Sequence, residues 1–204
     1  MSLRNRYPRA SLKRFFKRFR RREDGGITIE AVLMVPLLFW SMFASFTFFD
    51  GYRQSGRNLK AAYALADVVS RERSEINSAY LTNVHAVFEN MVSQRTDSSI
   101  RITYLIYQQT GDRLDLEWSC VRGAVYQGKE WSQANIQGMK ASLPEMPDKG
   151  RMIVVETTNT YIRPFKLGFG ADFFQMDNIV FTHPRVFDQI VVDPLASNCN
   201  IELG

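Results

Sequence analysis

Glu30 carries a negative charge at the start of a long uncharged stretch, which is an unusual position for a carboxylate. Glu30 directly precedes a stretch of 19 residues, 31–49, that contains no charged side chain. A helix of about 20 apolar residues crosses the roughly 30 Å of hydrocarbon in a bilayer, so this stretch predicts a membrane span. A carboxylate within hydrocarbon costs about 2.5–3.5 kcal/mol in insertion measurements. Glu30 therefore either pairs with a cation or lies at the level of the lipid headgroups, one turn inside the helix.

Positive charge is concentrated before Gly25. Ten of the 26 basic residues lie there: Arg4, Arg6, Arg9, Lys13, Arg14, Lys17, Arg18, Arg20, Arg21 and Arg22. The positive-inside rule places residues 1–25 in the cytoplasm and the chain after Asp50 outside. From Gly26 onward there are 16 basic and 19 acidic residues (26 − 10 and 21 − 2), a net charge of −3. The high pI therefore comes from residues 1–25, the leader, and the rest of the chain is mildly acidic. Because this distribution fits a membrane-orienting leader better than a DNA-binding surface, we expect no nucleic-acid partner. No small-x-small site follows the span, which argues against an ordinary cleaved secretory signal.

The run Gly25-Gly26-Ile27-Thr28-Ile29-Glu30-Ala31, followed by Pro36-Leu37-Leu38, adds a processing signal. It resembles the start of type IV prepilins, and most closely the TadE-like pseudopilins of tight-adherence (Flp) pilus systems. The resemblance covers about residues 20–70. It implies that a prepilin peptidase cuts after Gly25, so that Gly26 becomes the amino terminus and Glu30 the fifth residue. It also implies which cation pairs with Glu30: the freed amine of Gly26, on this chain or a neighbouring subunit. Many true pilins have phenylalanine where this chain has Gly26, so N-methylation is not expected.

The resemblance implies a structural role without enzymatic activity. The expected function is a minor pilin or pseudopilin that helps to assemble a tight-adherence pilus, single-pass in a bacterial inner membrane with its carboxyl-terminal domain in the periplasm. Its expected partners are the prepilin peptidase, other pilin subunits, the pilus assembly machinery and membrane lipid. No cofactor and no small-molecule substrate are implied. The alternative is an uncleaved, signal-anchored periplasmic binding module, which needs no glycine at a fixed distance before a carboxylate.

Pro36 lies inside the expected span and removes one helical hydrogen bond. The proline predicts a kink, either with a role in assembly or simply tolerated in a membrane helix.

Two amphipathic helices are expected after the span. The first continues to about Arg73, and the second starts with Ser74 as its N-cap. Either both apolar faces pack on a sheet, or part of them forms a seam with a partner helix. The expected apolar stripes are Leu59, Ala62, Tyr63, Ala66 and Val69, and then Ile76, Tyr80, Val84, Val87, Phe88 and Met91.

From Ser98 the apolar period changes from 3.6 to 2, which indicates strands. Residues 100–107 and 114–120 flank the turn 109–112 and predict a hairpin with one apolar and one wet face. Further strands are expected at about 152–163 and 179–190, where Pro184 requires an edge or a bend. Residues 127–150 read as loop plus a short helix. The aromatic, glycine-rich segment 164–174 is expected to cover the sheet or to form a partner-binding surface.

The expected fold class is therefore α+β and type IV pilin-like: a long N-terminal transmembrane helix packed against a small antiparallel sheet. The expected divisions are a cytoplasmic leader (1–25), a span (26–49), a helical stalk (50–95) and a periplasmic sheet domain (96–204).

Cys120 and Cys199 are the only two cysteines. An oxidising periplasm allows them to form a disulfide, and closing so long a loop stabilises by about 4 kcal/mol on the chain-entropy model. The alternative is that Cys120 is a buried free thiol. Two distant cysteines without clustered histidines do not predict a zinc site. Neither His85 nor His183 has a recognisable nucleophile or metal-ligand partner in sequence, so no catalytic residue is predicted.

Overall fold

The computed structural model describes residues 26–92, 97–166, 168, 170, 172–186 and 190–201. The leader, including Gly25, lies outside the described residues. The chain divides into two compact units, Met1–Thr47 and Phe48–Gly204. The layout is α+β, with a long apolar amino-terminal helix and a small antiparallel sheet.

The first described element, α2 (Gly26–Ser70), is one helix of 45 residues. It passes through Pro36, Gly51 and Gly56 without interruption. It ends at Ser70, a turn before the expected end at Arg73, because the Ser70 hydroxyl donates to the Asp67 carbonyl (2.8 Å). The next backbone N–H groups, of Arg71 and Glu72, then bond to carbonyls three residues back, which tightens the last turn.

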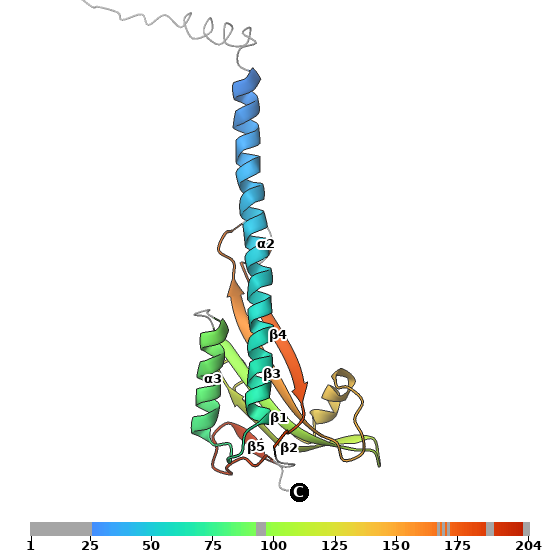
Figure 1. Cartoon of the computed structure of the whole chain (residues 1–204). Coiled ribbons are helices and arrows are strands. Elements are labelled where there is room, and N and C mark those ends of the chain that lie inside the picture. Colours follow the sequence, from blue (N-terminus) through green and yellow to red (C-terminus); the bar gives the residue numbers. More distant parts are fainter. Residues whose placement is uncertain are drawn as a thin grey trace, which may run out of the picture. The chain divides into compact units, whose positions relative to one another are not determined.

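All strand pairs of the sheet are antiparallel, and the strand order is β4-β3-β1-β2-β5. The strands are β1 (Ser98–Gln108), β2 (Arg113–Arg122), β3 (Arg151–Ile162), β4 (Phe173–Thr182) and β5 (Cys199–Ile201). The expected hairpin and third strand are present. The second half of α2 and α3 (Ser78–Val92) cover one face of the sheet (Figure 1). The buried apolar residues of α2 and α3 therefore belong to the core of the sheet unit.

The helix-side core differs in detail from the expected stripes. On α2, Leu59 and Tyr63 are exposed. On α3, the expected Val84 and Phe88 are buried, whereas Val87 and Met91 are exposed. Leu81 and Val92, which were not expected, are also buried. The buried apolar residues of α2 within this core are Ala61, Ala62, Leu65, Ala66 and Val69.

The expectation of one wet sheet face is wrong. A β-bulge at Glu117 pairs Tyr104 with Trp118 but Leu105 with Leu116. Because a bulge inserts one extra residue, Leu116 and Trp118 point to opposite faces although they are two residues apart. Trp118 joins the helix-side core, and Leu116 joins a second core on the other face.

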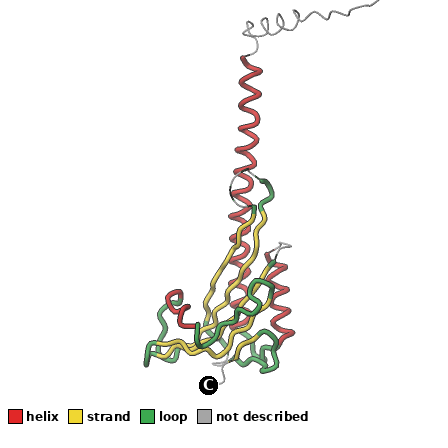
Figure 2. The backbone as a smooth tube through the Cα atoms, turned by 180° about the vertical axis from the view of Figure 1, so that it is seen from behind, coloured by secondary structure: helices red, strands yellow, loops and turns green. Residues whose placement is uncertain are grey.

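A long connection covers this second face. It runs from β2 to β3 and contains η2 (Ile136–Ser142), whose Ile136 and Met139 are buried against the sheet (Figure 2). Side-chain amides of Gln133 and Gln137 exchange hydrogen bonds with the backbone of Leu114, and Gln133 also accepts from the N–H of Leu116. These amides satisfy the edge of β2 beyond the three residues that β5 pairs.

Two expectations about the start of α3 are corrected. Ser74 is not the N-cap of α3. Asn77 is, since its side-chain oxygen accepts the N–H of Tyr80 (2.9 Å). Ile76 lies before the helix and pairs with Val192 in an isolated parallel bridge.

The expected strand 179–190 is displaced. β4 begins at Phe173, inside the segment expected to be a loop, and ends at Thr182, just before Pro184. The short strand β5 was not expected, because three residues carry too little periodic pattern to indicate a strand.

Candidate membrane segment and assembly site

The first half of α2 is long and apolar enough to cross a membrane. Its large apolar side chains are exposed rather than packed, which is the arrangement expected of a helix whose solvent is lipid. Those before Asp50 are Ile29, Val32, Leu33, Met34, Val35, Leu37, Leu38, Phe39, Trp40, Met42, Phe43, Phe46, Phe48 and Phe49.

Gly26 and Glu30 stand one turn apart at the start of this helix. Gly26 is the first residue of α2, and Glu30 is exposed. Helical Cα–Cβ bonds tilt toward the amino terminus, so the carboxylate of residue i+4 leans toward the turn that contains residue i. The amino-terminal end of a helix also favours negative charge. Among the described residues, no basic side chain forms an ion pair with Glu30. A carboxylate is therefore presented next to the position of an amine that cleavage after Gly25 would create.

Pro36 lies within α2, which is one helix on both sides of it. The expected kink stays a prediction.

Buried polar groups that the sequence did not single out hold the second half of α2 to the sheet unit. The Gln54 amide donates to the carbonyl of Val92 (2.6 Å). The Asn58 amide donates to the Gln54 carbonyl and to the sulfur of Met176 on β4. Hydrogen-bonded polar groups at a buried helix surface select one rotation of the helix, because any other leaves them without partners.

Asp50 is the first charged residue after the uncharged stretch, and it contacts the sheet. Its carboxylate accepts a hydrogen bond from the Tyr161 hydroxyl of β3 (3.0 Å). Burial and this hydrogen bond raise the pKa of Tyr161 to about 12. The phenol therefore remains a donor throughout the physiological pH range.

Cys120 and Cys199 are joined by a disulfide in the structure. They are direct cross-strand partners in the β2–β5 pair. The bond holds the carboxyl-terminal segment to the sheet, together with the backbone bond from Val121 N–H to the Asn198 carbonyl (2.9 Å).

We expect non-reducing peptide mapping of the native protein to recover the Cys120–Cys199 linked peptide, because the two residues face each other across a strand pair. Both cysteines should resist alkylation until a reductant is added. Free, alkylatable thiols at both positions in freshly isolated protein would contradict this expectation.

A second unforeseen group lies on the face opposite α2. The guanidinium of Arg101 on β1 forms a two-pronged ion pair with Glu156 on β3 (Nη2 to Oε1, 2.6 Å). It lies over the rings of Tyr126 and Trp131, 4.7 and 4.6 Å from their centroids. Arg101 also donates to the carbonyl of Lys129, and the Trp131 indole donates to Glu156. This Arg101 clamp fastens residues 126–131 to the sheet, a structural role.

Burial, together with the nearby Glu156, raises the pKa of Tyr126 to about 12. The ring that Arg101 covers is therefore a neutral phenol at physiological pH, and its contact with the guanidinium does not depend on pH in that range.

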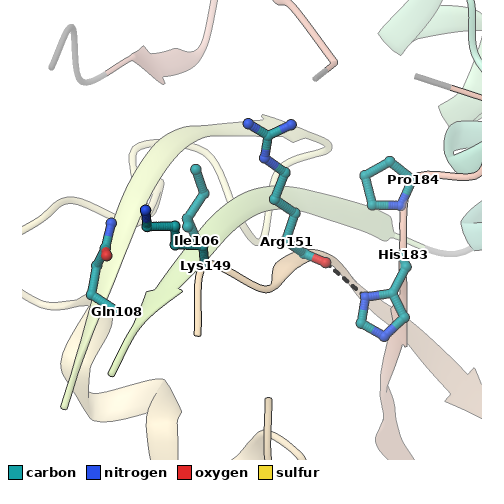
Figure 3. Close-up of a pocket in the computed structure, with 6 residues that line it drawn as sticks. All are labelled: Ile106, Gln108, Lys149, Arg151, His183 and Pro184. Carbon is teal, nitrogen blue, oxygen red and sulfur yellow. Dashed lines mark hydrogen bonds between the residues drawn. The ribbon is translucent and has the colours of Figure 1, made fainter. Parts of the chain in front are cut away.

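A basic hollow of about 530 Å³ lies where β1, β3 and β4 end (Figure 3). Lys149 and Arg151 contribute its charged side chains, and the His183 ring donates from Nδ1 to the Arg151 carbonyl (2.7 Å). Lys149 has a positive φ of 58°, held by its N–H bond to the Tyr107 carbonyl. The hollow has the charge to accept an anion.

The described residues contain no group of three or more His, Cys, Asp or Glu side chains placed to hold a metal ion. His85 contacts the carbonyl of Ser98 (3.1 Å), which ties α3 to the start of β1.

Comparison of the chain with protein-family models, curated proteins and solved structures finds no significant match.

Proposed function

We propose that the protein is a minor pilin or pseudopilin of a tight-adherence type IV pilus, processed after Gly25 by a prepilin peptidase. The observation that carries this proposal is the construction of α2. It is a single helix that begins at Gly26, presents Glu30 one turn later, and ends as part of the core of an antiparallel sheet unit. This is the plan of a type IV pilin subunit, with a membrane-length half and a half that carries a folded domain.

In this function the protein is inserted in the bacterial inner membrane with its leader in the cytoplasm and its sheet unit in the periplasm. Cleavage exposes the amine of Gly26. The amine then pairs with Glu30 of the same or a neighbouring subunit, which offsets the cost of keeping the carboxylate in the membrane. Other pilin subunits and the assembly machinery are the partners.

The test is processing of the leader. Protein extracted from membranes of a cell with an active prepilin peptidase should begin at Gly26, 25 residues shorter than the translated chain. Gly25→Leu should leave the precursor uncut. Gly56→Leu is the matched control, because a Cβ atom added at Gly56 meets no atom within 4 Å. A mature membrane form that retains Met1 would refute the proposed processing.

The second candidate is an uncleaved, anchored binding module, and the basic hollow at Lys149 and Arg151 favours it. The same measurement separates the two functions, since this module requires no cut after Gly25.

A further inference from the structure

The ends of β3 and β4 farthest from the basic hollow expose an apolar surface. Ile162 and Phe173 are opposite each other in the strand pair and are 56% and 60% exposed. Phe174 and Phe165 are also exposed. Soluble domains seldom leave several large apolar side chains together in water, so this hairpin tip (Ile162, Phe165, Phe173 and Phe174) requires an occupant.

The hairpin tip lies beside α2 at a defined level. The Tyr161 hydroxyl donates to Asp50, and the ring of Tyr161 packs against that of Phe174 (4.9 Å between centroids). A methyl group on Gly51 would be 3.9 Å from Tyr161 Cε1 and 4.0 Å from Phe174 Cζ. Figures 1 and 2 both show the ends of β3 and β4 beside this part of α2.

That level on α2 is where the uncharged stretch ends. Asp50 is the first charge after residues 31–49, and Phe48, Phe49 and Tyr52 are exposed around it. If the stretch crosses a bilayer, the boundary between hydrocarbon and water must fall close to Asp50. Because the tip is fastened to Asp50 and Gly51 within one compact unit, it reaches the same boundary.

The composition of the tip fits that boundary. Segments that lie in the membrane interface bury large apolar side chains such as Phe, Trp and Leu at the boundary between headgroups and acyl chains. Cationic side chains accompany them: Lys166 pairs with Asp172 across the tip (2.8 Å), and Arg53 stands on α2 one turn after Asp50. Long basic side chains at this depth extend toward lipid phosphates.

We propose that the β3–β4 hairpin tip inserts into the interfacial layer of the bilayer that α2 crosses, as a second attachment of the sheet unit to the membrane. The attachment sits to one side of α2, so it opposes tilting of the sheet unit relative to the membrane. This inference rests on the membrane span of the proposed function, and it is independent of cleavage after Gly25.

The experiment uses the full chain in vesicles of phosphatidylcholine and phosphatidylglycerol. An environment-sensitive fluorophore is attached to Phe173→Cys, and quenching is measured with lipids that carry a nitroxide at the headgroup or deep in the acyl chain. Leu38→Cys reports on the span. Leu195→Cys, 90% exposed and away from the tip, is the matched control. The native cysteines are joined to each other and do not take the label.

We expect the fluorescence emission of the Phe173 probe to shift to shorter wavelength and to be quenched by the headgroup nitroxide. The Leu38 probe should be quenched by the nitroxide deep in the acyl chain. The Leu195 probe should be unaffected. If the Phe173 probe remains exposed to water while the Leu38 probe is quenched, the inference is overturned and the membrane span stands. A Phe173 probe shielded from water but not quenched by lipid overturns it in favour of a protein partner. An unquenched Leu38 probe removes the span and the inference together. Retention of Met1 with a quenched Phe173 probe refutes the pilin processing alone.

Discussion

Glu30→Val is expected to abolish assembly while the protein still inserts and is still cut. Removal of the carboxylate makes the helix more apolar, so insertion becomes easier. The basic leader and Gly25 are unchanged, so orientation and cleavage should persist. What is lost is the counter-charge of the Gly26 amine. The attraction of two unit charges 4 Å apart rises from about 1 kcal/mol in water to about 4 kcal/mol at an effective dielectric constant of 20.

The readouts are pilus formation and co-purification of partner subunits, each normalised to the amount of processed protein in the membrane. Glu30→Gln preserves the shape of the side chain and removes its charge, so this variant should fail to assemble, as Glu30→Val does. Glu75→Val, at an exposed position after α2, is the control and should assemble normally. Normal pili and normal partner capture by Glu30→Val would show that the carboxylate only lies at the headgroups.

Arg101→Ala is expected to destabilise the sheet unit by about 3–5 kcal/mol, the usual cost of removing one member of a buried ion pair. Both side chains of the Arg101–Glu156 pair are only 13% exposed. The substitution leaves the Glu156 carboxylate without its cation and removes the contacts with Tyr126, Trp131 and the Lys129 carbonyl. Arg101→Lys should recover only part of the loss, since lysine has no planar fork and stacks less well.

The measurement is denaturant unfolding of the full chain in detergent, followed by near-ultraviolet circular dichroism, which reports the packing of aromatic side chains, Trp131 among them. Arg113→Ala is the matched control, because the Arg113–Asp115 pair is largely exposed and such pairs contribute about 0–1 kcal/mol. Equal midpoints for the two variants would contradict the role of the Arg101 clamp. The double change Arg101→Met with Glu156→Leu should be less harmful than Arg101→Ala alone, because it leaves no uncompensated charge.

The elements that sequence predicted well are those with long, regular patterns. The alternation in 98–107 and 152–163 identified β1 and β3, and the uncharged run identified the apolar half of α2. The pattern misled at β2, where apolar residues at 114, 116, 118 and 120 suggested one face. A bulge at Glu117 divides them between two cores, and nothing in their spacing marks it.

Long-range partners were beyond the reach of local patterns. Arg101 and Glu156 are 55 residues apart, and only the β1–β3 register makes them neighbours. The hydrogen bond between Asp50 and Tyr161 spans 111 residues. The role of Asn77, by contrast, could have been predicted from the sequence, because asparagine is one of the preferred N-cap residues. Its side chain accepts the N–H of Tyr80.

The Cys120–Cys199 bond has a mechanical consequence. In the proposed function the protein is a filament subunit under tension, and a chain that unravels under load lengthens by roughly 3.3–3.6 Å for every residue released. The disulfide closes a loop with a sequence separation of 79 residues, and that loop contains β3 and β4. On the same scale, that segment would extend by about 270 Å. The disulfide prevents this extension when the membrane helix and the carboxyl-terminal end are pulled apart. The segment between the two cysteines cannot extend, which makes the cross-link a limit on extension as well as a source of stability.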